Sequence, residues 1–198
     1  MATPDDLSLY ARELTINHNR TAPTHQWVKD SEQWKPLVQS YLASVSFVDQ
    51  QVGRLLDAIA DSPHHDNTYV VLFSDHGWHL GQKERWAKMS QWEASTNVPL
   101  IIAGPGIGKG QVCNKPVQLL DIYPTLLDLT GLQNDPKLHG HSVRPMLENA
   151  KADWPHLART CNGPGNYGIY SERYRYIHYN DGSEEFCDHA DGPHEWKI

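Results

Sequence analysis

The sequence predicts an α/β fold followed by a small antiparallel β subdomain. Three observations support the α/β layer: a long amphipathic helical pattern over residues 31–60, two short apolar runs at 68–73 and 98–103, and a short helical pattern at 119–129. Helices that alternate with buried strands are typical of an α/β domain with a largely parallel sheet. Beyond about residue 133, aromatic and charged residues alternate as in a half-exposed antiparallel strand.

Composition limits the possible functions. The 198 residues suggest one domain at about 150 residues per domain, and 39% hydrophobic residues with seven Trp and nine Tyr are enough for a real core. The formal charge is −7, from 17 basic and 24 acidic residues, which lacks the clustered Lys and Arg of a nucleic-acid binder. No run approaches the roughly 20 apolar residues of a membrane span. We therefore expect neither nucleic-acid nor membrane binding.

The chain divides into three segments by its patterning. Residues 1–30 are polar and poorly patterned, 31–132 carry the α/β pattern, and 133–198 form the expected C-terminal subdomain. The first residues show neither the charged nor the apolar region of a signal peptide. The three cysteines are Cys113, Cys161 and Cys187. They form no CxxC pattern and no dense disulfide framework, so they do not identify the cellular compartment of the protein.

The long helical pattern has clear limits in the sequence. Apolar residues recur at three- and four-residue spacing from Trp34 to Ile59. Ser31 is a suitable N-cap, and Pro36 falls where the first turn tolerates it. Since Ser62 and Pro63 open a polar stretch, we expect the helix to run from Ser31 to about Ala60.

The two apolar runs read as buried strands. The first, Thr68–Phe73, is β-branched and leads directly into Ser74-Asp-His-Gly77. The second, Val98–Ala103, is closed by Gly104-Pro-Gly106. The helix expected at Leu119–Leu129 is followed by Gly131, which suits a C-terminal cap.

A hairpin is expected near the C-terminal end. Tyr170 to Tyr179 alternates aromatic and charged residues, which predicts one strand. Asp181-Gly182 is a strong hairpin-turn signal, and Glu184–Cys187 would be the returning strand.

The most informative residues are Asp75 and His76. They follow a buried strand, and ligands of open α/β sheets lie at the carboxyl ends of strands. A carboxylate beside an imidazole can supply two ligands to one divalent cation. Gly77 and Gly81 allow tight turns around the pair. The alternative is that Asp75 caps a turn and His76 is a satisfied core residue.

Lys88 lies a short loop beyond this pair. A lysine near a metal would supply a compact positive charge to an anionic group such as sulfate or phosphate. Lys83 and Arg85 are competitors for that role. Each of the three residues could equally be a solvated surface charge.

Four ordered motifs resemble the type I sulfatases, and the iduronate-2-sulfatase-like members in particular. They are Tyr41-Leu-Ala-Ser-Val-Ser-Phe-Val-Asp-Gln-Gln-Val-Gly53, Ser74-Asp-His-Gly-Trp-His-Leu-Gly81, Val98-Pro-Leu-Ile-Ile-Ala103 and Leu119-Leu-Asp-Ile-Tyr-Pro-Thr-Leu126. The stretches Tyr170–Tyr176, Asp188-His189 and Pro193-His-Glu-Trp196 also resemble that group's C-terminal subdomain. The resemblance covers about residues 35–198, and it is the combination that is specific.

The resemblance implies a fold and a chemistry. The fold would be a partial alkaline-phosphatase-like α/β core, and the activity would be hydrolysis of sulfate esters, with a sulfated carbohydrate as substrate. By position, Asp75 and His76 resemble ligands of the family's calcium ion. Lys88 resembles the catalytic lysine that contacts the sulfate, and His79 is expected to bind substrate beside it. Family members are usually periplasmic, secreted or lysosomal.

The sequence departs from the family in two respects. The family's nucleophile is a formylglycine made from a Cys (or Ser) in a Cys-x-Pro/Ala-x-Arg motif, and no cysteine of this chain lies in that motif. The family's aspartate pair after the first strand is also missing, since Asp5-Asp6 follows no apolar run. Because a complete sulfatase is more than twice as long, we expect a C-terminal portion that ends before the family's last helix.

These departures leave three interpretations open. In the first, the chain is a sulfatase portion that is inactive alone and needs a separate N-terminal half as partner. In the second, it comes from another hydrolase of the superfamily, such as a phosphodiesterase or a phosphonate monoester hydrolase. In the third, it is a non-catalytic α/β remnant.

Overall fold

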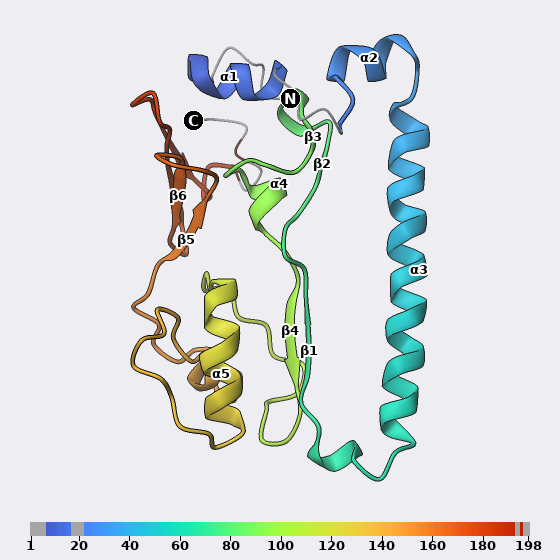
Figure 1. Cartoon of the computed structure of the whole chain (residues 1–198), viewed down its shortest axis with the longest axis vertical. Coiled ribbons are helices and arrows are strands. Elements are labelled where there is room, and N and C mark those ends of the chain that lie inside the picture. The colour runs from blue at the N-terminus through green and yellow to red at the C-terminus, as the bar shows by residue number, and fades with distance from the viewer. Residues whose placement is uncertain (1–6, 17–21, 193–194, 196–198) are drawn as a thin grey trace.

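The computed structural model describes residues 7–16, 22–192 and 195. Of the tail motif, Pro193, His194 and Trp196 therefore lie outside the described residues, as does the end of the chain. In Figure 1, strands β1 and β4 form a central ribbon with helix α3 on one side and α5 on the other, and the C-terminal sheet lies beside them below helix α1. Among the described residues, no helix has the length and apolarity to cross a membrane.

The weakly patterned N-terminal segment contributes two helices, α1 (Leu9–Ile16) and α2 (His25–Asp30). Leu7 and Ala11 pack with Trp92 and with two residues of the C-terminal segment, Ile177 and Tyr179, to form a buried cluster. The beginning and end of the chain thus share one core. The sequence did not predict this contact, because eight residues with a modest apolar face give little periodic signal.

Helix α3 runs from Trp34 to Ala60, so the expected end is confirmed and the expected start is wrong by three residues. Ser31 does not cap α3: it ends α2, where its hydroxyl donates to the carbonyl of Trp27 at 2.6 Å. Gln33 is the N-cap residue, and Pro36 lies in the first turn as expected.

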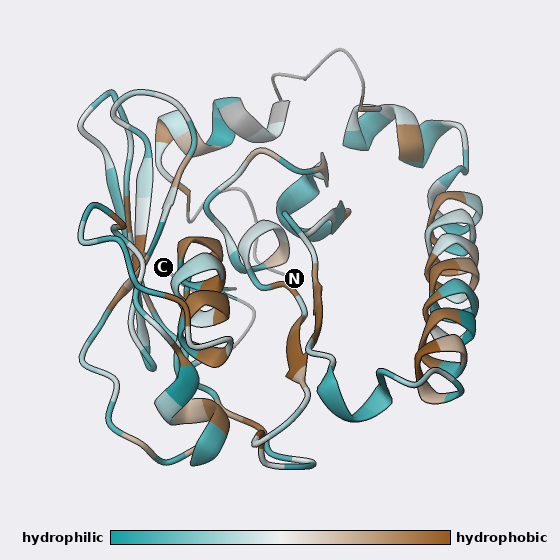
Figure 2. Cartoon of the chain, turned by 60° about the horizontal axis from the view of Figure 1, so that its bottom comes forward, coloured by the Kyte–Doolittle hydropathy of each residue, from teal (hydrophilic) through white to brown (hydrophobic). Residues whose placement is uncertain are grey.

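Helix α3 touches the rest of the chain near its first turn, where Trp34 packs edge-on against Trp86. None of its residues is buried, and its apolar stripe is visible in Figure 2. The exposed members are Tyr41, Leu42, Val45, Val48, Leu55 and Leu56. An apolar stripe of this size is typical of a surface that packs against other protein.

The central strands are β1 (Val70–Phe73) and β4 (Leu100–Ala103), within the two apolar runs. They pair antiparallel, with Val70 opposite Ala103, so the expected parallel pairing is wrong. A parallel pair needs a connection that crosses to the opposite end of the sheet, usually through a helix. Here the connection contains β2 (His79–Leu80), β3 (Trp86–Ala87) and the four-residue α4 (Glu93–Thr96), and it returns to the end of β1 at which it started, with Phe73 opposite Leu100.

Two further helical segments lie beyond β4. A 3₁₀ turn at Leu119–Asp121 continues into α5 (Ile122–Leu129), which confirms the expected helix. Gly131 has φ +71° and follows the helix end, as a C-terminal cap requires. The remaining short elements are α6 (Arg144–Glu148) and 3₁₀ turns at His65–Asn67 and Gln82–Glu84.

The C-terminal antiparallel sheet is confirmed, with strand order β5-β6-β7-β8. Its strands are β5 (Ala158–Cys161), β6 (Tyr167–Tyr170), β7 (Tyr174–His178) and β8 (Glu184–Asp188). The single strand expected from Tyr170 to Tyr179 is wrong, because a tight turn at Ser171 separates β6 from β7: its amide donates to the Tyr174 carbonyl at 2.9 Å. The hairpin turn at Asp181-Gly182 is confirmed, with Gly182 at φ +85°.

Candidate functional site

Asp75 and His76 lie just past the C-terminal end of β1, separated from Phe73 by one residue. The Asp75 Oδ1 to His76 Nε2 distance is 3.6 Å, so both side chains reach one point. His76 Nδ1 lies 2.9 Å from the Gly77 carbonyl, which assigns the ring proton to Nδ1. Nε2 therefore carries the lone pair, in the tautomer that a metal-ligating histidine uses.

The third member of the group is Lys88, whose Nζ lies 2.6 Å from His76 Nε2. Since the imidazole accepts there, the ammonium of Lys88 donates. A carboxylate, an imidazole lone pair and an ammonium thus meet beside β1. The lone pair and the carboxylate attract a cation, and the ammonium attracts an anion.

The backbone that carries Lys88 is strained. Four non-glycine residues have positive φ within this loop, a conformation that L-residues rarely adopt; they are Lys83, Glu84, Ala87 and Met89. The guanidinium of Arg85 donates to the carbonyls of Lys88 and Met89, at 3.2 and 2.7 Å. Strain of this kind persists where surrounding contacts fix the loop, as happens at functional sites.

Gly77 ties the end of β1 to helix α4. Its amide donates to the Ser95 carbonyl at 2.8 Å, and a Cβ at Gly77 would lie 2.2 Å from the Ala94 carbonyl oxygen. Only glycine permits this approach. The position of His76 is therefore coupled to the segment that holds Lys88 and α4.

The competitors of Lys88 point elsewhere. Lys83 is buried, and its Nζ donates to the carbonyl of Glu195 at 2.7 Å. Arg85 is buried against the carbonyls of its own loop. Of the three cations weighed from the sequence, Lys88 is the one that contacts His76.

The structure does not present His79 to a substrate. The side chain is 0% exposed, with Nε2 2.8 Å from Ser90 Oγ and Nδ1 3.2 Å from the Gln82 carbonyl. Burial lowers the pKa of His79 to about 4. In this structure the His79 ring therefore belongs to the core.

Burial of His79 predicts a pH dependence of stability. The pKa is about 4 in the folded chain against an ordinary 6.5, so the unfolded chain takes up a proton that the folded chain refuses. The free energy of unfolding should fall as the pH drops below 6.5, and the contribution of His79 to this fall should end near pH 4. Between pH 7.5 and 5.0, His79 alone should lower the free energy of unfolding by about 2 kcal/mol. Urea unfolding measures this change. The His79→Gln protein should lack the part of the pH dependence that is due to His79, and the His64→Gln protein, changed at an exposed histidine, should keep it. Equal pH slopes in all three proteins would contradict the argument.

A cleft of about 1110 Å³ opens beside the group. Its lining includes Asp75, His76 and Lys88, and also Arg159 of β5 and Ser171 of the turn between β6 and β7. The site therefore opens between the α/β layer and the C-terminal sheet, where it is accessible to a ligand of sugar size.

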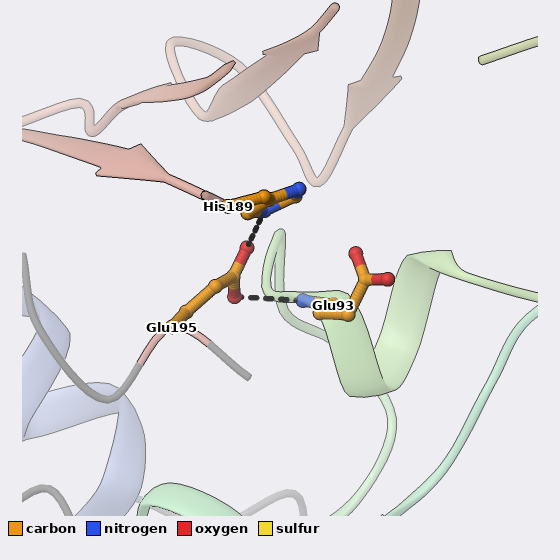
Figure 3. A group of neighbouring side chains, drawn as sticks. All are labelled: Glu93, His189 and Glu195. Carbon is orange, nitrogen blue, oxygen red and sulfur yellow. Dashed lines mark hydrogen bonds and ion pairs between the residues drawn. The ribbon is translucent and has the colours of Figure 1, made fainter. Parts of the chain in front are cut away.

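A second cluster of charged side chains lies between α4 and the tail. Among the described residues, Glu93, His189 and Glu195 form a group with potential metal ligands within 4.8 Å of one another. Figure 3 shows the Glu195 carboxylate between the His189 ring, at 3.2 Å, and the backbone amide of Glu93, at 2.9 Å.

Cations of the protein already neutralise this cluster. Arg175 forms ion pairs with both Glu93 and Glu195, the latter at 2.6 Å. Burial alone would raise the pKa of Glu195, but the hydrogen bond from His189 and the charge of Arg175 outweigh it and lower the pKa. With Lys83 bonded to the Glu195 carbonyl, two cations balance two carboxylates. The cluster is therefore a buried ion-pair network.

Sequence reasoning missed this network. Glu195 belongs to a tail stretch that resembles the sulfatases, but no local pattern gives this residue a role. Its contacts lie 112 residues away, at Lys83, and 102 residues away, at Glu93. Pairing over such distances leaves no periodic signal in the sequence.

The layered fold and a site at the end of its central strand define a partial alkaline-phosphatase-like hydrolase fold. The sulfatase family model matches residues 14–132, and the model of the N-sulphoglucosamine sulphohydrolase C-terminal region matches residues 75–198. The chain belongs to the sulfatase family.

Individual relatives agree with this assignment. A sulfatase of Formosa agariphila is 44% identical over 183 residues, which cover 92% of this chain and 36% of the relative. A protein solved in complex with its substrate D-glucosamine-2-N,6-O-disulfate superposes with a TM-score of 0.77 at 31% identity, over 84% of this chain and 37% of that one. A phosphonate monoester hydrolase of Silicibacter pomeroyi has a TM-score of 0.66 at 26% identity, over 76% of this chain and 34% of that one. The chain thus spans little more than a third of these proteins.

Proposed function

We propose that this chain is the part of a sulfate-ester hydrolase that supplies one side of the active site. The observation that carries the proposal is the meeting of Asp75, His76 and Lys88, with Lys88 Nζ 2.6 Å from His76 Nε2. Asp75 and His76 would hold a divalent cation, and Lys88 would bind the sulfate group. Family membership supports the reaction class.

The donor set fits a cation. The Nε2 lone pair of His76 lies beside the Asp75 carboxylate, and in this structure the Lys88 ammonium occupies the place that a bound cation would take. Calcium is the ion that the resemblance implies, and it would polarise a sulfate oxygen when bound. Two ligands leave such an ion largely hydrated, so we expect the chain alone to bind calcium weakly.

The substrate we propose is a sulfated carbohydrate. The cleft beside Lys88 is large enough for a sugar, and the structural relative in complex with D-glucosamine-2-N,6-O-disulfate supports this class. An iduronate-2-sulfatase-like preference is the finer form of the proposal, and it rests on the motif resemblance around Ser74–Gly81.

The remaining partner would be the other part of the sulfatase fold. The apolar stripe of α3 and the exposed Phe73 and Ile101 of the central ribbon are surfaces that this part would cover. It would also carry the nucleophile, since no cysteine of this chain lies in a Cys-x-Pro/Ala-x-Arg motif.

Reconstitution tests the proposal. The chain alone should show no turnover of an aryl sulfate or a sugar sulfate, because it has no activated nucleophile. Co-expression with a sulfatase N-terminal segment that carries the Cys-x-Pro/Ala-x-Arg motif should give turnover, and Asp75→Ala in this chain should abolish it. Turnover by the 198-residue chain alone that is lost in Asp75→Ala would contradict the division of roles.

A phosphonate monoester hydrolase is the second candidate, because that structural likeness reaches a TM-score of 0.66. The same reconstituted enzyme should be offered a sulfate monoester and a phosphonate monoester of one leaving group. A higher kcat/KM for the phosphonate would favour the second candidate.

A further inference from the structure

Glu195 holds both ends of the segment that carries Lys88. Its backbone carbonyl accepts a hydrogen bond from Lys83 Nζ at 2.7 Å, and its side-chain Oε2 accepts one from the backbone amide of Glu93 at 2.9 Å. Lys83 and Glu93 lie five residues before and five residues after Lys88. Glu195 therefore contacts both ends of the loop formed by residues 83–93.

The contacts that fix Glu195 are buried. Glu195 is 1% exposed and Arg175 is 3% exposed, and their charged atoms lie 2.6 Å apart. Arg175 also donates to the carbonyl of Gln91 at 3.0 Å, and Tyr170 donates to the same carbonyl at 2.7 Å. Away from water, such ion pairs and charge-assisted bonds are strong and geometrically specific. The C-terminal sheet thus sets the path of residues 83–93.

The loop needs an outside clamp. Positive φ at Ala87 and Met89, on either side of Lys88, is a conformation that an unconstrained chain would leave. Arg85 fixes the carbonyls of Lys88 and Met89 inside the loop. Contacts with the C-terminal sheet fix the position of the loop relative to that sheet, because the sheet is a separate element.

We propose that Glu195, with Arg175, is a positioning residue that fixes the loop displaying Lys88 and so places its ammonium beside His76. Glu195 would thereby affect the candidate active site without contacting it, because it holds residues 83 and 93 at the two ends of the loop that carries Lys88. This inference rests on the proposed role of Lys88 at the sulfate. The contact itself, however, can be read without any turnover.

The test measures the ¹⁵N NMR chemical shifts of the His76 ring nitrogens in the full chain labelled with ¹⁵N-histidine. At pH 8 an ordinary imidazole is neutral, and a ring nitrogen that accepts a hydrogen bond resonates upfield of one with a free lone pair. His76→Gln assigns the signal, and Lys88→Met gives the position without the donor. In Glu195→Ala, the Nε2 signal of His76 should move to the Lys88→Met position.

Two further variants separate positioning from general stability. Glu184→Ala removes an exposed carboxylate from the same sheet and should leave the His76 signal in place. Glu195→Gln keeps an acceptor for the Glu93 amide but loses the charge that pairs with Arg175. In this variant the Nε2 signal of His76 should therefore lie between its positions in wild type and in Glu195→Ala. A wild-type signal in a folded Glu195→Ala would overturn the proposal. So would loss of the whole fold in both Glu195 variants, because the residue would then support the entire chain.

The outcomes also separate this inference from the proposed function. If Lys88→Met abolishes turnover in the reconstituted enzyme and Glu195→Ala leaves the His76 signal unchanged, the positioning role fails and the function stands. If Lys88→Met leaves turnover unchanged, the proposed function fails whatever the His76 signal does.

Discussion

Replacing Arg175 with methionine should lower the free energy of unfolding by about 3–5 kcal/mol, the usual cost of leaving a buried charge without its partner. Methionine keeps much of the apolar stem but removes the guanidinium that pairs with Glu93 and Glu195. Glu195 is 1% exposed, so water cannot replace the lost cation. Urea unfolding followed by tryptophan fluorescence measures the change.

Arg173→Met is the matched control. Arg173 lies two residues away on the same hairpin and also pairs with a carboxylate, that of Asp188, but its side chain is 56% exposed. Exposed ion pairs contribute little, because water and salt replace them. Adding Glu195→Gln to Arg175→Met should restore part of the stability, since the unpaired charge is removed. Equal losses in Arg173→Met and Arg175→Met would show that burial does not determine the cost.

The features that the sequence predicted are those with a local cause. The apolar spacing from Trp34 to Ile59 identifies α3, even though none of its residues is buried in this chain. A strand that leads into Asp75-His76 predicts the site, because strand ends are where side chains of an α/β layer meet. The Asp181-Gly182 turn fixes its hairpin for a similar reason, through the positive φ that glycine allows.

The features that the sequence did not predict depend on contacts between distant residues. Strand direction is one example, since β1 and β4 are equally apolar in either orientation and only the path between them makes the pair antiparallel. His79 is another: its place beside Asp-His suggested a ligand, whereas packing against Trp92 makes it a core residue. The bond between Glu195 and Glu93 spans 102 residues, and no repeat or spacing reveals it.

Lys88 should matter most for turnover in the reconstituted enzyme. Lys88→Met keeps a flexible stem of similar length and removes the ammonium beside His76. Removing one preorganised charge or donor from the reacting group typically lowers kcat about 10²–10³-fold. We expect a loss of that size in kcat/KM for a sulfate ester. Lys137→Met, which removes an exposed lysine from a loop before α6, should leave kcat/KM unchanged.

Lys88→Arg sharpens this test. An arginine keeps the positive charge but replaces a compact ammonium with a broad planar fork. Because Lys88 Nζ approaches His76 Nε2 to 2.6 Å, the broader guanidinium cannot place its charge at the same point. Lys88→Arg should therefore recover little of the activity lost in Lys88→Met. Full recovery would mean that the site needs only a positive charge, and the placement of that charge by the loop would then not be required for turnover.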